Sequence, residues 1–587
     1  MFLDASGRFI VRRLILAVAG LCGTAGLIIE YGLYPSAGLH TAASVLSAAA
    51  VGLFLLEQVL SLRDSGSFRL YLKARWPTFA LSVLLLLEIL ALVAGRRTVW
   101  LDRTLGHLAL GSVTRAYLII IQVYIVSVFA VQLPHLHRRF ASLRVRPAVA
   151  FMMTFLALIF LGAGLLLLPR ATPSGQPLAP LDALFTSTSA VCVTGLIVRD
   201  TGTGFTVFGQ AVILALIQLG GLGIMSLTAA LSLLLGRGIG VRESSLLREV
   251  FQVPMLSAVG RTVRFIILMT FSLELVGAYS LYRGLADVIP DTGERAFTAV
   301  FHAVSAFCNA GFSTFSDSLV SLQGNSLVMA TVSGLLIVGG LGFGVVAQLL
   351  AWLRGRHLKP GAPKVRLDLH SRVVLVVSGG LLLVGTVFVA WFEWNNTLAG
   401  QPFVLKLSQA FFQSATCRTA GFNSLDLTLM TEATLFLMIV LMFIGGAPGS
   451  TAGGVKVTVV AIAWANLRSI TRGLNQVRLG RRELDQVHVQ RSMLVLSAGL
   501  VLAAVGLFIL LATEKRPFLE TTFEVFSALG TVGLSLGMTS VLSPAGRIVI
   551  SVLMFVGRLG PLTLASSLTG ASRDSRVRLP RGRVMIG

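Results

Sequence analysis

In four short segments of the chain, a run of mostly apolar or small residues leads to a glycine. We call them the glycine segments, and they read TSTSAVCVTGL (186–196), AVSAFCNAGF (303–312), QSATCRTAGF (413–422) and FSALGTVGL (526–534). Their key residues, Gly195, Gly311, Gly421 and Gly533, lie 116, 110 and 112 residues apart. Because glycine frees the backbone dihedrals, neighbouring carbonyl oxygens can point at a dehydrated cation. The chemistry that these segments favour is therefore coordination of a cation by backbone oxygens.

The elements around the glycine segments repeat as well. Each segment lies between two apolar runs of about 20 residues, which is the length that crosses a bilayer. The stretch before the first glycine, PLDALFTSTSAV (180–191), is apolar but too short to span, so we expect it to dip into the membrane and return. A helix there would aim its partly negative C-terminal end at the cavity. A single such glycine could serve helix packing instead, but four in register favour one module used four times around a pore.

The bulk composition excludes a soluble protein of this length. The 587 residues are 55% hydrophobic and 12% charged, and the mean hydropathy is +0.85. The first apolar run has no small-residue cleavage site, so we interpret it as an anchor. The predicted fold is an all-α polytopic membrane protein with spans near 9–29, 41–61, 77–95, 108–133, 147–168, 207–235, 261–284, 325–353, 371–394, 431–467, 490–512 and 542–569.

This pattern divides the chain into five parts. An N-terminal region of four spans, 1–146, precedes four membrane–pore–membrane units at 147–240, 241–356, 357–482 and 483–587, the last with a short basic tail. The N-terminal part has too few arginines in its fourth span for steep voltage sensing, and an assembly appendage is the alternative.

The net charge of +23 is placed in alternate loops rather than on one nucleic-acid-binding face. Basic clusters occur in alternate loops at 8–13, 63–75, 138–146, 237–264, 354–366, 468–482 and 573–583. Arg96, Arg97 and Arg103 depart from this pattern, because they fall on the predicted outer side. Under the positive-inside rule both termini are cytoplasmic. The clusters could serve orientation and lipid head-group contact, or they could dock a cytosolic partner.

Each second helix of a unit is interrupted by glycines. The interruptions read GGLG (220–223), GGLG (339–342), GGAPGSTAGG (445–454) and VGRLGP (556–561). Pro448 and five glycines cannot sustain a helix, and unwound backbone at membrane depth must line an aqueous cavity. Lys456 and Arg558 are intramembrane cations nearby. Lys456 could instead extend to the cytoplasmic interface, whereas a functional role is expected for Arg558.

Charged residues also flank the glycine segments. Asp200, Asp317 and Asp426 follow three of them on the predicted outer side, where they could concentrate cations, cap their own loops, or do both. Arg418 lies within the third segment, and we expect it to point away from the pore and pair with a carboxylate.

The segments SAVCVTGLIVRDTG, SAFCNAGFSTFSD, TCRTAGFNSLD and SALGTVGLSLGMT resemble the filters of the Trk/Ktr/HKT superfamily of potassium transporters, especially its bacterial membrane subunits KtrB and TrkH. The resemblance covers roughly 147–569. It implies a potassium filter and an intramembrane gate. The implied filter residues are Val193, Thr194, Gly195, Asn309, Ala310, Gly311, Thr419, Ala420, Gly421, Thr531, Val532 and Gly533. The implied gate residues are Gly445, Gly446, Pro448, Gly449, Gly453, Gly454, Lys456 and Arg558.

The resemblance also implies partners and a location. We expect a homodimer in the bacterial cytoplasmic membrane, regulated by a cytosolic nucleotide-binding ring of the TrkA or KtrA kind. Potassium is the expected bound and transported ion, since sodium-favouring relatives often have serine where this chain has Gly195. A sodium-permeable or sodium/potassium-cotransporting member is the alternative. The protein could act as a gated channel or as an ion-coupled transporter, in which case it would be a symport system.

Other chemistry has no motif in the chain. There is no Walker A lysine motif, no HExxH pair and no dinucleotide fingerprint, so we expect neither an organic cofactor nor an enzyme. Cys22, Cys192, Cys308 and Cys417 are expected to be packing residues, with metal ligation as the lesser alternative. A polytopic membrane enzyme or scaffold is the remote alternative to a transporter.

Overall fold

A computed structural model describes residues 5–33, 37–64, 147–223, 256–355 and 366–560, except positions 475 and 481, and also the isolated positions 68 and 79. The predicted spans 77–95 and 108–133 and the basic tail lie outside the described residues. The described part is helical, and its strands are the two-residue β1 (Arg478–Leu479) and β2 (Arg482–Glu483), which pair antiparallel.

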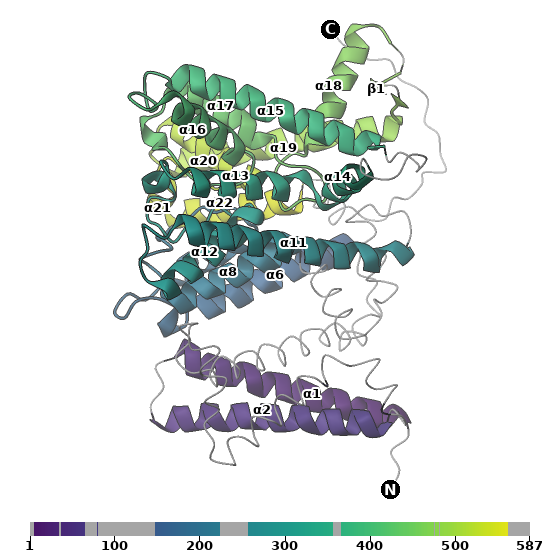
Figure 1. Cartoon of the computed structure of the whole chain (residues 1–587), viewed down its shortest axis with the longest axis vertical. Coiled ribbons are helices and arrows are strands. Elements are labelled where there is room, and N and C mark those ends of the chain that lie inside the picture. Colours follow the sequence, from purple (N-terminus) through teal and green to yellow (C-terminus); the bar gives the residue numbers. More distant parts are fainter. Residues whose placement is uncertain are drawn as a thin grey trace.

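The N-terminal helices form a hairpin of their own. α1 (Ala5–Leu27) continues into a short π-helix (Ile28–Gly32), and α2 (Ala37–Asp64) packs back along it. Figure 1 shows this purple pair at one end of the molecule, beside the larger helical body. The body begins at residue 147.

The larger body alternates long helices with short ones. Its helices are α6 (Pro147–Leu166), α7 (Pro180–Val191), α8 (Val207–Leu222), α11 (Leu256–Gly284), α12 (Thr292–Phe307), α13 (Ser326–Leu341), α14 (Phe343–Gly355), α15 (Leu369–Glu393), α16 (Phe403–Thr416), α17 (Glu432–Phe443), α18 (Val457–Thr471), α19 (Gln486–Thr513), α20 (Phe518–Gly530), α21 (Met538–Val541) and α22 (Pro544–Leu559). Three-residue 3-10 turns lie at Pro169–Ala171, Val320–Leu322 and Leu427–Leu429.

The starts of the predicted spans agree with the starts of these helices where both can be compared, but the predicted spans 325–353 and 431–467 are each divided between two helices. Each predicted span in the described residues starts within five residues of a helix start. Within the described residues, four helical stretches are long and apolar enough to cross a membrane: 41–64, 262–284, 369–393 and 486–513. A fifth candidate, α13 with α14, bends by 105° at its break. The total of twelve spans stays a prediction, because other apolar helices are shorter or run into residues that are not described.

Glycine ends three of the helices where the sequence predicted interruptions. Gly223, Gly342 and Gly560 follow α8, α13 and α22 with φ of 75°, 89° and 81°, a left-handed conformation that side chains rarely adopt. Just before these ends, glycines lie directly against the short helices. A Cβ atom there would meet a backbone carbonyl oxygen, as Gly220 would meet that of Val191 and Gly557 that of Leu529.

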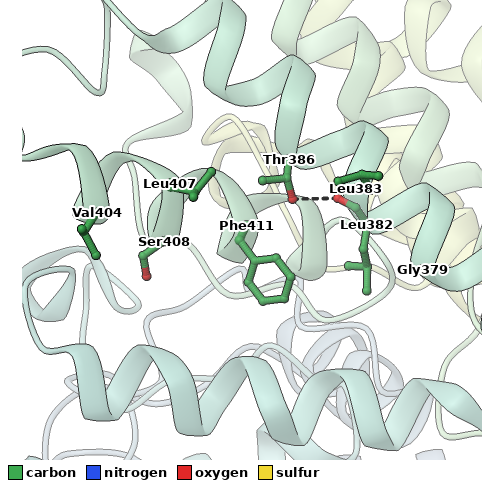
Figure 2. A pocket seen from close by; sticks show the side chains of 8 residues that line it. All are labelled: Gly379, Leu382, Leu383, Thr386, Val404, Leu407, Ser408 and Phe411. Atoms are coloured by element: carbon green, nitrogen blue, oxygen red, sulfur yellow. Dashed lines mark hydrogen bonds between the residues drawn. The ribbon is translucent and has the colours of Figure 1, made fainter.

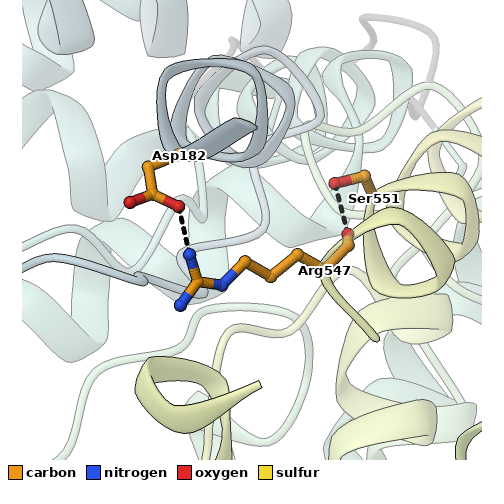
Figure 3. A network of polar contacts seen from close by, with 3 residues as sticks. All are labelled: Asp182, Arg547 and Ser551. Atoms are coloured by element: carbon orange, nitrogen blue, oxygen red, sulfur yellow. Dashed lines mark hydrogen bonds and ion pairs between the residues drawn. The ribbon is translucent and has the colours of Figure 1, made fainter. Parts of the chain in front are cut away.

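The last helix of the body returns to the first short one. α22 packs against α7, and Arg547 of α22 forms an ion pair with Asp182 in the first turn of α7 (Figure 3). Both side chains are 22% exposed, so the pair adds at most about 1 kcal/mol to the free energy of unfolding. The ion pair matters more for the relative orientation of α7 and α22, because it joins residues that lie 365 positions apart in the chain.

An apolar groove lies between α15 and α16. Figure 2 shows Leu382, Leu383, Leu407 and Phe411 around it, and Thr386 donates its hydroxyl hydrogen to the Leu382 carbonyl oxygen within α15 at 2.7 Å. No charged side chain lines the groove. A wall of this kind suits hydrocarbon and not a cation.

Candidate functional site

In each glycine segment, the glycine follows a helix that is too short to cross a membrane. α7, α12, α16 and α20 have 12, 16, 14 and 13 residues. At about 1.5 Å per residue they are about 18–24 Å long, below the roughly 30 Å of hydrocarbon. α7 covers the stretch 180–191, which the sequence predicted as a short helix, while its entry into the membrane stays a prediction.

The backbone turns in the same way after all four short helices. The residue two positions before each glycine has a positive φ: 56° at Val193, 58° at Asn309, 69° at Thr419 and 51° at Thr531. Three of these four residues are β-branched, for which the left-handed conformation is strained by about 1–3 kcal/mol. Each glycine then has a positive φ as well, between 70° and 97°. Alternation of this kind turns successive carbonyl groups to one side of the chain.

The four glycines face one another in a closed ring. A Cβ atom added to any of them would lie closer than 3.0 Å to a carbonyl oxygen of the next segment. The pairs are Gly195 with Ala310, Gly311 with Ala420, Gly421 with Val532, and Gly533 with Thr194. The ring therefore has no room for a side chain at any of the four glycines.

Backbone amides in the segments are held by the short helices. Thr194 N donates to Ser189 O at 2.8 Å, Ala310 N to Ser305 O at 2.8 Å, and Val532 N to Ser527 O at 2.8 Å. In the third segment Ala420 N donates to Thr416 O at 3.0 Å. No donor among the described residues bonds to the carbonyl oxygens of residues 194, 310, 420 and 532. The segments thus present free carbonyl oxygens around their ring.

Hydroxyl groups that the sequence did not single out bond to the backbone of each glycine or of the residue after it. Ser189 Oγ accepts a hydrogen bond from Gly195 N at 3.1 Å, and Ser527 Oγ accepts from Gly533 N at 3.1 Å. Ser305 Oγ donates to Phe312 O and Thr416 Oγ1 to Phe422 O, each at 2.8 Å. The available signal was a Ser-Ala pair six residues before three of the glycines.

Ser189→Ala is expected to lower ion discrimination, because it frees the amide of Gly195 and loosens the first segment. Ser187→Ala is the matched control: both serines are fully buried in α7, but Ser187 Oγ donates to Ile159 O of α6 at 2.7 Å. Each change should cost about 1 kcal/mol of stability. Relative uptake of potassium and sodium by the two variants in liposomes checks this. Equal discrimination by both would remove Ser189 from the site.

Two further polar side chains support the segments from behind, and each lies nine residues before its glycine. His302 Nε2 lies 2.9 Å from Ser313 Oγ, while its Nδ1 lies 2.8 Å from Thr298 O. Glu524 accepts from Ser535 Oγ at 2.7 Å and from the Thr539 hydroxyl. Both Ser313 and Ser535 come two residues after a glycine, so these contacts fix the chain as it leaves the ring.

The predicted break at 445–454 is an unwound loop that lies directly against the segments. Ala447 N donates to Gly340 O at 3.0 Å, and Thr451 Oγ1 donates to Phe307 O at 3.1 Å. A Cβ atom added at Gly453 would meet the Thr531 hydroxyl. The loop therefore contacts the ends of the second and fourth short helices.

Arg558 and Lys456 both bond to this loop. The guanidinium of Arg558 donates to the Thr451 carbonyl oxygen and, at 2.6 Å, to that of Gly220. Lys456 Nζ donates to the carbonyl oxygen of Ala452 at 2.7 Å, so its charge folds back onto the loop rather than extending along α18. Arg558 thus joins α22, the loop and the end of α8.

The expectation for Arg418 was half wrong. Its side chain does point away from the ring, but its guanidinium donates to the hydroxyl of Ser378 at 3.0 Å and to the Ser378 carbonyl oxygen at 3.3 Å. No carboxylate among the described residues pairs with it. Ser378 lies on α15, and together with the Gly445 carbonyl oxygen at 3.5 Å it accepts the hydrogen bonds of both terminal nitrogens of the guanidinium, whereas Arg418 Nε has no partner among the described residues.

The outer aspartates cap their own loops, which was one of the two readings. Asp200 accepts from Thr203 N at 2.7 Å, Asp317 from Ser321 N at 2.8 Å and Asp426 from Thr428 N at 2.9 Å. Asp317 and Asp426 are exposed and Asp200 is half-buried. Capping leaves their negative charges facing solvent, so it does not compete with an electrostatic role.

The cysteines are free thiols. Cys192, Cys308 and Cys417 are buried at the ends of short helices, and Cys22 is partly exposed. No group of three or more metal-ligating side chains occurs in the part of the chain that the structure describes.

The fold is that of a helical membrane protein, and the comparisons with known proteins give its family. Residues 117–572 match the TrkH family of cation transport proteins, and the chain belongs to this family. It is 39% identical to the Ktr system potassium uptake protein B of Bacillus subtilis over 76% of this chain and 97% of the relative. It is 36% identical to the potassium/sodium uptake protein NtpJ of Enterococcus hirae, over 76% of this chain and 98% of the relative.

A solved structure shares the fold. The potassium transporter TrkH from Vibrio parahaemolyticus superposes with a TM-score of 0.56 over 89% of this chain and 98% of that one, at 19% sequence identity. The chain is accordingly a multi-pass membrane protein of a family of transporters.

Proposed function

We propose that this chain is the potassium-translocating membrane subunit of a bacterial uptake system. The observation that carries the proposal is the closed ring of Gly195, Gly311, Gly421 and Gly533 with free carbonyl oxygens beside each. A ring of backbone oxygens can replace the hydration shell of a potassium ion. The filter in this proposal is Val193–Gly195, Asn309–Gly311, Thr419–Gly421 and Thr531–Gly533, and its bound ligand is the transported ion.

Selectivity for potassium over sodium is supported by the first glycine. A serine at that position is common in sodium-favouring members of the superfamily, and this chain has Gly195. Similarity to a potassium/sodium uptake protein keeps sodium permeation as the second candidate. The two candidates differ in one measurable quantity, the ratio of the two permeabilities.

The proposed architecture is four membrane–pore–membrane units at 147–240, 241–356, 357–482 and 483–587 around this ring, after the region 1–146. Support comes from the recurrence of short helix, left-handed residue and glycine in all four. Both termini would be cytoplasmic, and the protein would act as a homodimer in the cytoplasmic membrane.

The loop 445–454 is the proposed gate. It is unwound, it contacts the C-terminal end of α12, and Arg558 ties it to α8. A cation fixed beneath a carbonyl ring opposes the passage of potassium, and Lys456 adds a second one. At the other end, Asp200, Asp317 and Asp426 would raise the local concentration of cations.

The proposed regulatory partner is a cytosolic nucleotide-binding ring of the TrkA or KtrA kind, and names such as "Ktr system potassium uptake protein B" are consistent with a multi-subunit system. The hairpin β1–β2 presents Arg478 and Arg482 to solvent at the N-terminal end of α19. A positively charged surface of this kind suits an acidic partner.

Charge reversal at Arg478, Arg481 and Arg482 is expected to weaken docking of this ring by about tenfold or more at low salt, without altering ion selectivity. The matched control reverses Lys515 and Arg516, which are exposed at the opposite end of α19. Binding of the purified ring is measured at two salt concentrations. Docking that ignores both the hairpin charges and the salt would contradict this surface.

The proposed function is tested by ion uptake into liposomes that contain the purified chain. Potassium uptake above that of empty liposomes, sensitive to the changes at the glycines, supports it. Absence of uptake with the regulatory ring present would favour the scaffold alternative.

A further inference from the structure

A carboxylate is buried in the middle of a membrane-spanning helix. Glu274 lies in the span 262–284 of α11, twelve residues from its start and ten from its end. Its side chain is 5% exposed, whereas Leu275 beside it is 72% exposed toward the surrounding lipid. An ionisable group at this depth is expensive, and such groups mark ion or proton sites in membrane proteins.

One oxygen of Glu274 is bonded and the other is free. Gln218 Nε2 of α8 donates to Glu274 Oε2 at 3.3 Å. Glu274 Oε1 has no partner among the described residues, and neither has the buried hydroxyl of Thr270, one turn earlier on the same face of α11. The site thus contains a carboxylate oxygen that is free to bind a proton.

Gln218 connects this carboxylate to the second glycine segment. Cys308 Sγ lies 3.7 Å from Gln218 Oε1 and donates its thiol hydrogen to it. Cys308 immediately precedes Asn309, whose left-handed backbone starts the turn toward Gly311 in the second segment. A side-chain path therefore runs from Glu274 through one amide to the ring.

The charged groups around Glu274 are few. α13, which packs against α11, and α8, which supplies Gln218, contain no charged residue. On α12, Glu294 and Arg295 lie in the first turn, far along the helix from Cys308, and His302 is bonded to Thr298 and Ser313. Arg558 is held by the carbonyl oxygens of Gly220, Gly221 and Thr451 rather than by Glu274. No cation within the described residues forms an ion pair with this carboxylate.

We propose that Glu274 is a proton-binding site and that its protonation controls how readily potassium passes the second glycine segment. The proposal rests on the proposed function in that the output is potassium flux. With Glu274 ionised, the Gln218 amide must donate to it, and its oxygen then accepts from Cys308. With Glu274 protonated, the carboxyl hydroxyl can donate to Gln218 Oε1 once the amide has rotated, because the two ends of an amide differ only in donor and acceptor character. Cys308 then loses its acceptor.

A proton on Glu274 also removes a negative charge that is linked to the second segment through Gln218 and Cys308. In the low dielectric of the protein interior, that charge attracts a potassium ion in the segments. We therefore expect flux to rise as the pH rises, following the titration of one group over about two pH units. Glu274→Gln mimics the protonated state and should show low flux with no such dependence.

The test uses the full chain in liposomes and two measurements. Potassium flux is recorded across a pH series for the wild type, for Glu274→Gln and for Glu57→Gln, a control at another buried glutamate on α2. The infrared carbonyl band of a protonated carboxyl group is recorded for the same proteins. Because Glu57 and Glu524 are buried as well, we expect one component of the band to disappear together with the pH dependence of flux in Glu274→Gln, and both that component and the pH dependence to persist in Glu57→Gln.

A second variant keeps the proposal open to refutation if Glu274→Gln fails to fold. Gln218→Leu should retain the carboxyl band while its flux loses most of the pH dependence. A wild-type pH profile in either variant would overturn the proposal. A titrating band in a wild-type protein that conducts no potassium at any pH would support the proton site and contradict the proposed function instead.

Discussion

Replacing Gly195 by serine is expected to lower the potassium-over-sodium permeability ratio by about tenfold or more, which corresponds to about 1.4 kcal/mol of discrimination. The glycine has a φ of 93°, and a Cβ atom there would meet the Ala310 carbonyl oxygen. A side chain must therefore displace the second segment, and the carbonyl spacing of the ring changes with it. Relative uptake of the two ions in liposomes measures the effect.

Gly164→Ser is the matched control for this change. Gly164 is an exposed glycine of α6 with ordinary helical backbone, and nothing lies within 4 Å of the position where its Cβ would be. The control should retain the wild-type permeability ratio. If Gly195→Ser folds and discriminates as well as Gly164→Ser, Gly195 does not belong to the filter.

Arg558→Ala is expected to raise potassium flux by about tenfold or more and to make it less dependent on the regulatory ring. Hydrogen bonds from a charged group contribute about 1.5–3 kcal/mol each, and Arg558 makes such bonds to both the loop and α8. Their loss frees the loop 445–454 and also removes the positive charge beneath the ring. Partial deletion of 445–454 should act in the same direction.

Arg547→Ala separates this gating effect from a general loosening of α22. It removes an arginine from the same helix and breaks the ion pair with Asp182, but it leaves the loop contacts in place. We expect slightly lower stability and unchanged flux. If Arg558→Ala instead abolishes transport at normal expression, the loop is a structural element and not a gate.

Local features of the fold were readable from the sequence because they depend on neighbouring residues. Apolar run length predicted where helices start, Pro180 and the apolar stretch after it predicted α7, and glycine clusters predicted the ends of α8, α13 and α22. Each of these is decided by backbone preference and hydrophobicity within about 20 residues.

The partners of the polar side chains were not readable, because some are distant in the chain and others depend on how the backbone turns after a helix. Arg558 bonds to residues 107 and 338 positions away, and Arg418 finds Ser378 rather than the expected carboxylate. Ser189 and Ser527 sit in apolar helices where a hydroxyl normally bonds to its own backbone. Only the folded arrangement shows that they instead hold the amides of two ring glycines.

The reversal potential of the purified chain under crossed potassium and sodium gradients tests the central claim most directly. Potassium conduction through the ring predicts a reversal potential near the potassium equilibrium potential, displaced toward sodium in Gly195→Ser and unchanged in Gly164→Ser. A wild-type value at the sodium equilibrium potential, or one that is the same in all three proteins, would contradict the assignment of the glycine ring as a potassium filter.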